Sequence, residues 1–158
     1  MPSLGLPNLN ICATIQAYMK VLQFEPRLKI KIPFYQGLVS AGFPSPAEDY
    51  SDKKLDLNEY LIKHPASTFF VKVTGDSMIE AGIFPEDMLI VDRYPTPKSG
   101  QVVLAVVDGE FTVKRYQKIG EIIKLIPANP KYQPIEFVDG QELIIWGVVT
   151  QVLHDPNR

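Results

Sequence analysis

Ser77 is the residue of this sequence best suited to act as a nucleophile. It lies in the run Gly75-Asp76-Ser77-Met78, directly after an apolar stretch at residues 69–73 that is typical of a β-strand. A serine on a tight turn beside a glycine exposes its hydroxyl, and nearby backbone N–H groups can stabilise an oxyanion. The simpler alternative is that Asp76 or Ser77 caps a short helical turn at residues 78–81, since short serine motifs also recur by chance.

A nucleophilic serine needs a base, and Lys114 is the better candidate for that role. The histidines are unfavourable, because His64 precedes a proline and His154 lies in the last few residues. Ser–Lys pairs are a known variant of the Ser–His–Asp arrangement. Strand alternation in FTVKRY places Thr112, Lys114 and Tyr116 on one face. A strand lysine is usually solvated, so the role of base requires a burial that favours the neutral amine.

The elements that must position these two residues are predicted to be mostly β-strands. Short apolar runs alternate with turn signals, and Asp108-Gly109 is a strong hairpin signal. Such spacing favours a mostly-β barrel or sandwich. A short helix over residues 55–63 is expected ahead of the strands, capped by Asp56 and ended at His64-Pro65. The expected strands cover residues 69–73, 88–92, 101–107, 111–116, 122–126, 135–138 and 143–153.

The first 45 residues have a different pattern. Residues 10–22 carry apolar side chains at near-helical spacing, which indicates a short amphipathic helix. Residues 32–46, IPFYQGLVSAGFPSP, are rich in proline and glycine, which favours an extended, exposed segment. We therefore expect an N-terminal arm over residues 1–45 and a folded domain over residues 46–158.

The composition is that of an ordinary globular protein. The 158 residues are 46% apolar and 22% charged, and the formal net charge of −2 predicts neither sequence-specific nucleic-acid binding nor membrane contact. Cys12 is the one cysteine, which excludes an intrachain disulfide and a cysteine-rich metal site, and no metal or cofactor is expected. No apolar run reaches the roughly 18 residues of a membrane span, and no secretion signal is recognisable, so a cytoplasmic location is expected.

Between residues 32 and 154 the chain resembles the UmuD/LexA family of self-cleaving Ser–Lys peptidases, peptidase family S24. Ser77 and Lys114 are 37 residues apart, the separation that this family uses between nucleophile and base. Ala41–Gly42 lies 36 residues before Ser77, where the family places the bond that it cuts. The resemblance covers about four-fifths of the chain. The matching blocks are AGFPSPAEDY, LDLNEYLIKHP, FFVKVTGDSM, DMLIVDR, GQVVLAVVDGEFTVKR, LIPANPKYQPI and WGVV.

The resemblance implies a compact, mostly-β peptidase fold with an extended N-terminal arm that carries the cleavage site. Ser77 is then the nucleophile, Lys114 the general base and Ala41–Gly42 the bond that the protein cuts in itself. The resemblance also implies a homodimer and cleavage stimulated by RecA filaments on single-stranded DNA. It implies that the trimmed form is an accessory subunit of an error-prone Y-family translesion polymerase in the SOS response.

The residues around Ala41–Gly42 suit a segment that must lie extended beside Ser77. Its prolines resist collapse into a helix, and glycine after the cut lets the backbone approach the nucleophile closely. A small residue before the cut suits a narrow pocket. UmuD-type members have Cys-Gly at this step, whereas Ala41-Gly42 resembles the pair in LexA. The alternative interpretation of the segment is a plain linker.

Three other functions are compatible with parts of the sequence. A LexA-like transcriptional repressor needs a DNA-reading module, but only about forty residues precede the cleavage segment and few of them are basic. A signal peptidase also uses Ser–Lys chemistry, but it needs a membrane anchor. A catalytically silent binding module with a peptidase fold is disfavoured by the presence of both Ser77 and Lys114.

Overall fold

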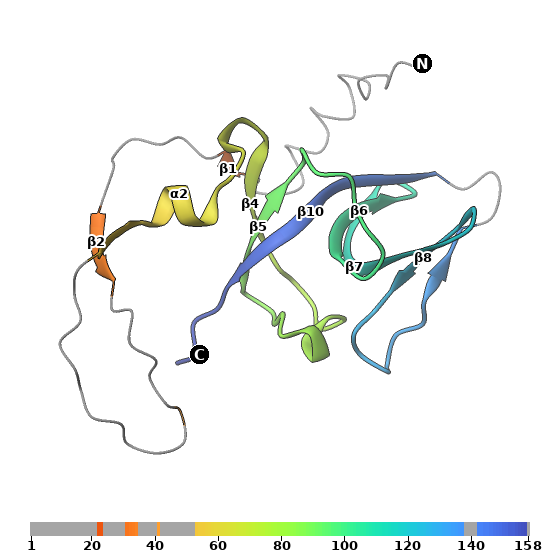
Figure 1. Ribbon diagram of the computed structural model, residues 1–158. Helices are drawn as coiled ribbons and strands as arrows, with labels where there is room; N and C mark the ends of the chain where they lie inside the picture. Colours follow the sequence, from red (N-terminus) through yellow and green to blue (C-terminus); the bar gives the residue numbers. More distant parts are fainter. Residues whose placement is uncertain (1–21, 24–30, 35–40, 42–52, 138–141, 158) are drawn as a thin grey trace, which may run out of the picture.

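An antiparallel β-sheet forms the body of the protein (Figure 1). The computed structural model describes residues 22–23, 31–34, 41, 53–137 and 142–157, and within them the sheet has eight strands. The expected mostly-β fold is confirmed. The order across the sheet is β1 (Leu22–Gln23), β4 (Thr68–Lys72), β5 (Met88–Asp92), β10 (Leu143–Leu153), β6 (Val102–Val107), β7 (Glu110–Ile119), β8 (Ile122–Ile126) and β9 (Ile135–Glu136).

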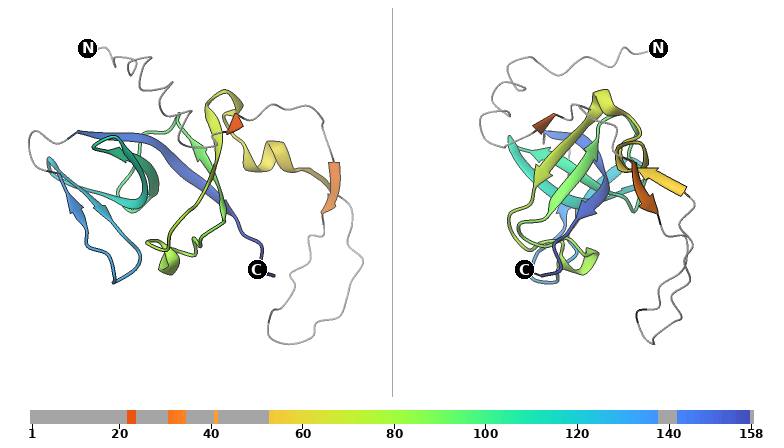
Figure 2. Two further views of the ribbon diagram at one scale, coloured as in Figure 1. Left: turned by 180° about the vertical axis from the view of Figure 1, so that it is seen from behind. Right: turned by 90° about the vertical axis from the view of Figure 1, so that its left-hand side faces the viewer.

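Strand β10 joins the two halves of this sheet. Its first part pairs with β6 and its second part with β5, so it lies between the β4–β5 half and the β6–β8 half (Figure 1). The pairing register shifts just before Gly147 and again after Val149, and each shift bends the strand. A side chain at 147 would not fit, because an added Cβ would lie 2.6 Å from Val91 Cγ1 and 3.0 Å from the backbone oxygen of Asp92. The sheet is accordingly strongly twisted and curved (Figure 2).

Two apolar clusters pack on opposite faces of the sheet. Alternate residues of β6 contribute to them, with Leu104 and Val106 in the first cluster and Val103 and Ala105 in the second. The first cluster contains Met78, which is 2% exposed, so the core anchors the residue that follows Ser77. The other buried members are Val71, Val73, Ile83, Leu89, Val91 and Trp146 in the first cluster and Tyr116, Leu125 and Val148 in the second.

Strand β7 carries Lys114 into the interior. Lys114 and Tyr116 are buried and Arg115 between them is exposed, which confirms the predicted alternation at these positions. The turn between β6 and β7 is the predicted Asp108-Gly109 hairpin. Both turn residues have positive φ, 49° and 86°, as the tightest hairpin turns require.

The predicted strands agree with the observed ones, apart from differences of a few residues at their ends. The helix predicted within residues 55–63 is confirmed, but the strand before it was not predicted: residues 53–56 form β3 (Lys53–Asp56), paired with β2 (Lys31–Phe34). Helix α2 covers Leu57–Leu61, and the Asp56 side chain caps it as expected, accepting from the N–H of Asn58 at 2.9 Å. Two short 3-10 helices, η1 (Pro65–Ser67) and η2 (Ile79–Ala81), complete these elements.

The N-terminal arm lies largely outside the described residues. The predicted helix at residues 10–22 falls there except for Leu22, which belongs to β1. The extended segment predicted at residues 32–46 is described only in part, and Ile32 to Phe34 are extended within β2 as expected. The boundary near residue 45 stays a prediction. None of the helices in the described part of the chain is long and apolar enough to cross a membrane.

Candidate active site

Ser77 lies on the turn between β4 and η2. Gly75 begins this turn with a φ of 84°, a left-handed conformation that glycine adopts without strain. The residue that precedes η2 is Met78, and no side chain caps the helix there. The alternative that Asp76 or Ser77 serves as a cap for this helical turn is therefore wrong. The Ser77 hydroxyl points to a different partner.

That partner is the side-chain amine of Lys114. Its Nζ lies 2.9 Å from Ser77 Oγ, 2.7 Å from Thr112 Oγ1 and 3.0 Å from the backbone oxygen of Val113. All three neighbours are uncharged oxygens. Among the described residues, no carboxylate forms an ion pair with this amine. The structure thus brings together the two residues that the sequence singled out.

The environment of Lys114 disfavours its charge. The residue is 7% exposed, and its partner across the β6–β7 pair is the fully buried Val103. This burial lowers the pKa of the Lys114 ammonium, since the charged form loses hydration and no anion replaces it.

The three contacts suit both protonation states of Lys114. An ammonium can donate to all three oxygens. A neutral amine has two N–H groups and one lone pair, so it can donate to Thr112 Oγ1 and to the Val113 oxygen while it accepts the Ser77 hydroxyl proton. Thr112 and the strand backbone therefore orient the lone pair toward the serine. This is the arrangement that a general base requires.

A small pocket of about 110 Å³ opens beside Ser77. Its walls come from β4 and the turn after it, from Ile83 after η2, from β6, and from the start of β7, and they combine polar and apolar groups. A pocket of this volume admits only a small side chain beside Ser77. The lining residues are Val71, Lys72, Val73, Thr74, Gly75, Ser77, Met78, Ile83, Leu104, Phe111, Thr112 and Val113.

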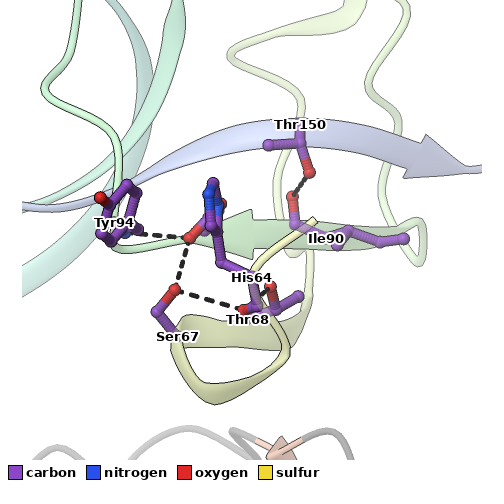
Figure 3. A network of polar contacts seen from close by, with 7 residues as sticks. His64, Ser67, Thr68, Ile90, Tyr94 and Thr150 are labelled. Carbon is purple, nitrogen blue, oxygen red and sulfur yellow. Dashed lines mark hydrogen bonds and ion pairs between the residues drawn. The ribbon is translucent and has the colours of Figure 1, made fainter. Parts of the chain in front are cut away.

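Both histidines bind carboxylates away from Ser77. His64 Nδ1 lies 2.5 Å from one oxygen of Asp92, and the Ser67 hydroxyl donates to the other oxygen at 2.8 Å (Figure 3). The carboxylate lies between the serine and the histidine, whereas a catalytic triad places the histidine between them. His154 Nδ1 lies 2.8 Å from the fully buried Asp87. In the described part of the chain neither ring nitrogen that forms a contact reaches Ser77, and the choice of Lys114 over the histidines stays a prediction.

A second polar group near Ser77 was not identified from the sequence. The side chain of Asp76 accepts a short hydrogen bond from the Tyr132 hydroxyl and a longer one from Asn129 Nδ2 at 3.4 Å. The hydrogen bond from Tyr132 is the main reason that the pKa of Asp76 is lowered, and the same contact raises the pKa of Tyr132. No local sequence pattern pairs these residues, since Asn129 and Asp76 are 53 positions apart.

Comparisons with known proteins find a matching family model and several similar proteins. The family model described as "Peptidase S24-like" matches residues 33–150. Protein SamA of Salmonella typhimurium is 48% identical over 122 residues, which are 77% of this chain and 84% of SamA. Protein MucA of Escherichia coli is 43% identical over 124 residues, with the same coverage. A LexA repressor of Stenotrophomonas maltophilia is 41% identical over 122 residues, which are 77% of this chain and 57% of the repressor.

Replacing Lys114 by methionine should stabilise the fold at neutral pH, because methionine fills similar space without a buried charge. The folded-state pKa of Lys114 lies below the unfolded value of ~10.4. Between the two values the unfolded chain binds more protons, so wild-type stability rises with pH. The advantage of Lys114→Met is thus greatest below the folded-state pKa and shrinks as pH approaches ~10.4.

Urea unfolding of both proteins across this pH range measures the difference. Lys118→Met, which removes an exposed lysine from the same strand, is the control and should show no such pH-dependent gain. A Lys114→Met advantage that does not change with pH would show that burial of the charge is not its cause.

Proposed function

The chain belongs to the Peptidase S24-like family and is of its UmuD type, and from this premise we propose that it is a self-cleaving serine endopeptidase. In the proposed site Ser77 is the nucleophile and Lys114 the general base. The observation that carries this assignment is the 2.9 Å contact between Ser77 Oγ and a buried lysine amine without a carboxylate partner among the described residues.

In the proposed reaction, the neutral Lys114 amine takes the proton of Ser77 as Oγ attacks the carbonyl carbon of Ala41. The resulting oxyanion is stabilised by backbone N–H groups of the nucleophile turn. The Lys114 ammonium then gives its proton to the nitrogen of Gly42, and the Ala41–Gly42 bond breaks. Water, deprotonated by Lys114, hydrolyses the ester between Ser77 and Ala41, and the serine recovers its proton.

Two observations support Ala41–Gly42 as the bond that is cut. Ala41 itself is exposed, as a residue that has to reach Ser77 needs to be. The pocket beside Ser77 is small, and its volume suits a side chain no larger than the methyl group of Ala41. Gly42 itself lies outside the described residues, and the docking of the segment against Ser77 is part of the proposal.

We further propose that the protein acts in the cytoplasmic SOS response. RecA filaments on single-stranded DNA stimulate its cleavage, and the trimmed form, as a homodimer, is an accessory subunit of a Y-family translesion polymerase. The similarity to SamA and MucA supports this role over that of a transcriptional repressor. The alignment covers 84% of each of those two proteins but 57% of the LexA repressor.

Incubation of the purified protein with RecA, single-stranded DNA and a nucleotide analogue should produce two fragments, residues 1–41 and 42–158. Ser77→Ala should stay intact, since the nucleophile is removed while a surface-turn hydroxyl contributes little to folding. Gly42→Glu should also stay intact, because a large charged side chain blocks close approach of the backbone to Ser77. Mass spectrometry identifies the products. A new N-terminus other than Gly42 would refute the site, and cleavage of Ser77→Ala at the wild-type rate would refute the nucleophile.

Spontaneous cleavage without RecA should speed up as pH rises from neutral toward about 10. Below the pKa of Lys114, each pH unit raises the neutral fraction about tenfold, and the rate levels off above it. Lys114→Arg should be inactive throughout, because arginine does not lose its proton in this range. The rate of loss of full-length protein gives the profile, with Lys118→Arg as the matched control. A flat wild-type profile, or cleavage by Lys114→Arg at high pH, would exclude Lys114 as the base.

The trimmed protein, and not the precursor, should support mutagenic lesion bypass. A variant that lacks residues 1–41 mimics the cleavage product, and the uncleavable Gly42→Glu variant mimics the precursor. A damage-induced mutagenesis assay with the cognate polymerase should show more mutants with the first variant than with the second. Equal mutation frequencies would contradict the polymerase role and leave the peptidase assignment untouched.

A further inference from the structure

We infer that Asn129 is a positioning residue that orients the oxyanion-binding N–H groups of the nucleophile turn, an inference that rests on the proposed peptidase function. The Nδ2 of Asn129 donates to the backbone oxygen of Asp76 at 2.9 Å. The backbone N–H of the preceding residue, Ala128, donates to the backbone oxygen of Ser77, also at 2.9 Å. The Asp76 oxygen also accepts a longer hydrogen bond, at 3.4 Å, from the N–H of Ile79 within the turn. The shorter contacts to two consecutive carbonyl groups of the turn thus come from the Ala128-Asn129 pair.

The segment that holds them is itself rigid. Asn129 is 3% exposed, and its Oδ1 accepts from the N–H of Lys131 at 3.0 Å, which sets the direction of Nδ2. Pro127 and Pro130 flank the Ala128-Asn129 pair, and proline restricts both its own φ and the conformation of the residue before it. The oxygen of Ala128 also accepts from the N–H of Glu80 at 2.9 Å, so the segment is fixed at both ends of the turn.

The geometry of the peptide unit means that restraining the two carbonyl groups also fixes the direction of the N–H groups of Ser77 and Met78. In a trans peptide unit the C=O and the N–H lie in one plane and point in opposite directions. The Asp76 carbonyl shares its unit with the N–H of Ser77, and the Ser77 carbonyl shares its unit with the N–H of Met78. Holding both carbonyls against the Ala128-Asn129 pair therefore points both N–H groups away from it. Among the hydrogen bonds between described residues, none uses either N–H group, so both are available for an oxyanion.

The role of Asn129 is separable from that of Lys114. The contacts of Lys114 are with Ser77, Thr112 and Val113, and those of the Asn129 side chain are with Asp76 and Lys131. Loss of the Asn129 amide should thus weaken stabilisation of the oxyanion without changing the titration of the base. Tyr132 provides a matched control, because Tyr132→Phe removes a contact to the Asp76 side chain but neither carbonyl contact.

The test compares two reactions at position 77 in the full-length protein. Phosphonylation of Ser77 by a fluorophosphonate places a negatively polarised oxygen in the oxyanion site, whereas alkylation of Ser77→Cys by iodoacetamide needs no such site. We expect Asn129→Ala to slow phosphonylation about tenfold to hundredfold at every pH, with an unchanged midpoint of the pH profile. Alkylation of the thiol should change less than about twofold. Tyr132→Phe should match the wild type in both reactions.

Each other outcome has a definite meaning. Unchanged phosphonylation in Asn129→Ala, a shifted midpoint, or an equal loss in alkylation would overturn the positioning role. If Asn129→Ala does not fold, as judged by its thermal unfolding, Asn129→Ser serves the same test, since its hydroxyl is too short to reach the Asp76 oxygen. A wild-type protein that reacts with neither the probe nor itself at Ser77 would instead refute the proposed function.

Discussion

The burial of one amine, that of Lys114, is the constraint on which the site depends. A lysine that serves as a base must lose its hydration, yet its N–H groups still need acceptors in the interior. Thr112 Oγ1 and the Val113 oxygen provide these acceptors from the same strand, so no carboxylate is required to hold the side chain. A carboxylate at either position would favour the ammonium and oppose its use as a base.

The curvature of the sheet helps to bring Ser77 and Lys114 together. Strands β4 and β7 are separated by β5, β10 and β6. In a flat sheet they would lie roughly 19 Å apart, at about 4.8 Å for each step. Ser77 follows β4 and Lys114 lies on β7, yet Oγ and Nζ are 2.9 Å apart. The sheet curls (Figure 2), and the turn after β4 also extends toward β7. The pairing register shifts along β10 on both sides of Gly147, which packs closely against Val91 and Asp92.

Most of the strands, and Ser77 and Lys114 as candidate site residues, could be predicted from local sequence patterns. Contacts between residues far apart in the sequence could not. Alternation within FTVKRY placed Thr112 and Lys114 on one face, and Asp108-Gly109 placed the hairpin. Strand β3 was not predicted, because the helical spacing of the apolar residues that follow it was the stronger local pattern. Its pairing partner, β2, lies in the N-terminal arm, far away in the sequence. The contacts of Asn129 with Asp76 join positions 53 apart, and no periodicity connects them. The resemblance to a known family supplied the roles, which spacing alone left open.

The proposed mechanism couples docking of the cleavage segment to the protonation of Lys114. A docked segment excludes water from the amine and so favours its neutral form, and by reciprocity the neutral amine favours the docked segment. When the coupling is complete, each tenfold increase in the ratio of neutral to charged Lys114 favours docking of the segment by ~1.4 kcal/mol. An activator that binds the docked state more tightly needs no catalytic group of its own, since it raises the population of a site that is already assembled. High pH and such an activator therefore both favour the same state, in which the segment is docked and Lys114 is neutral.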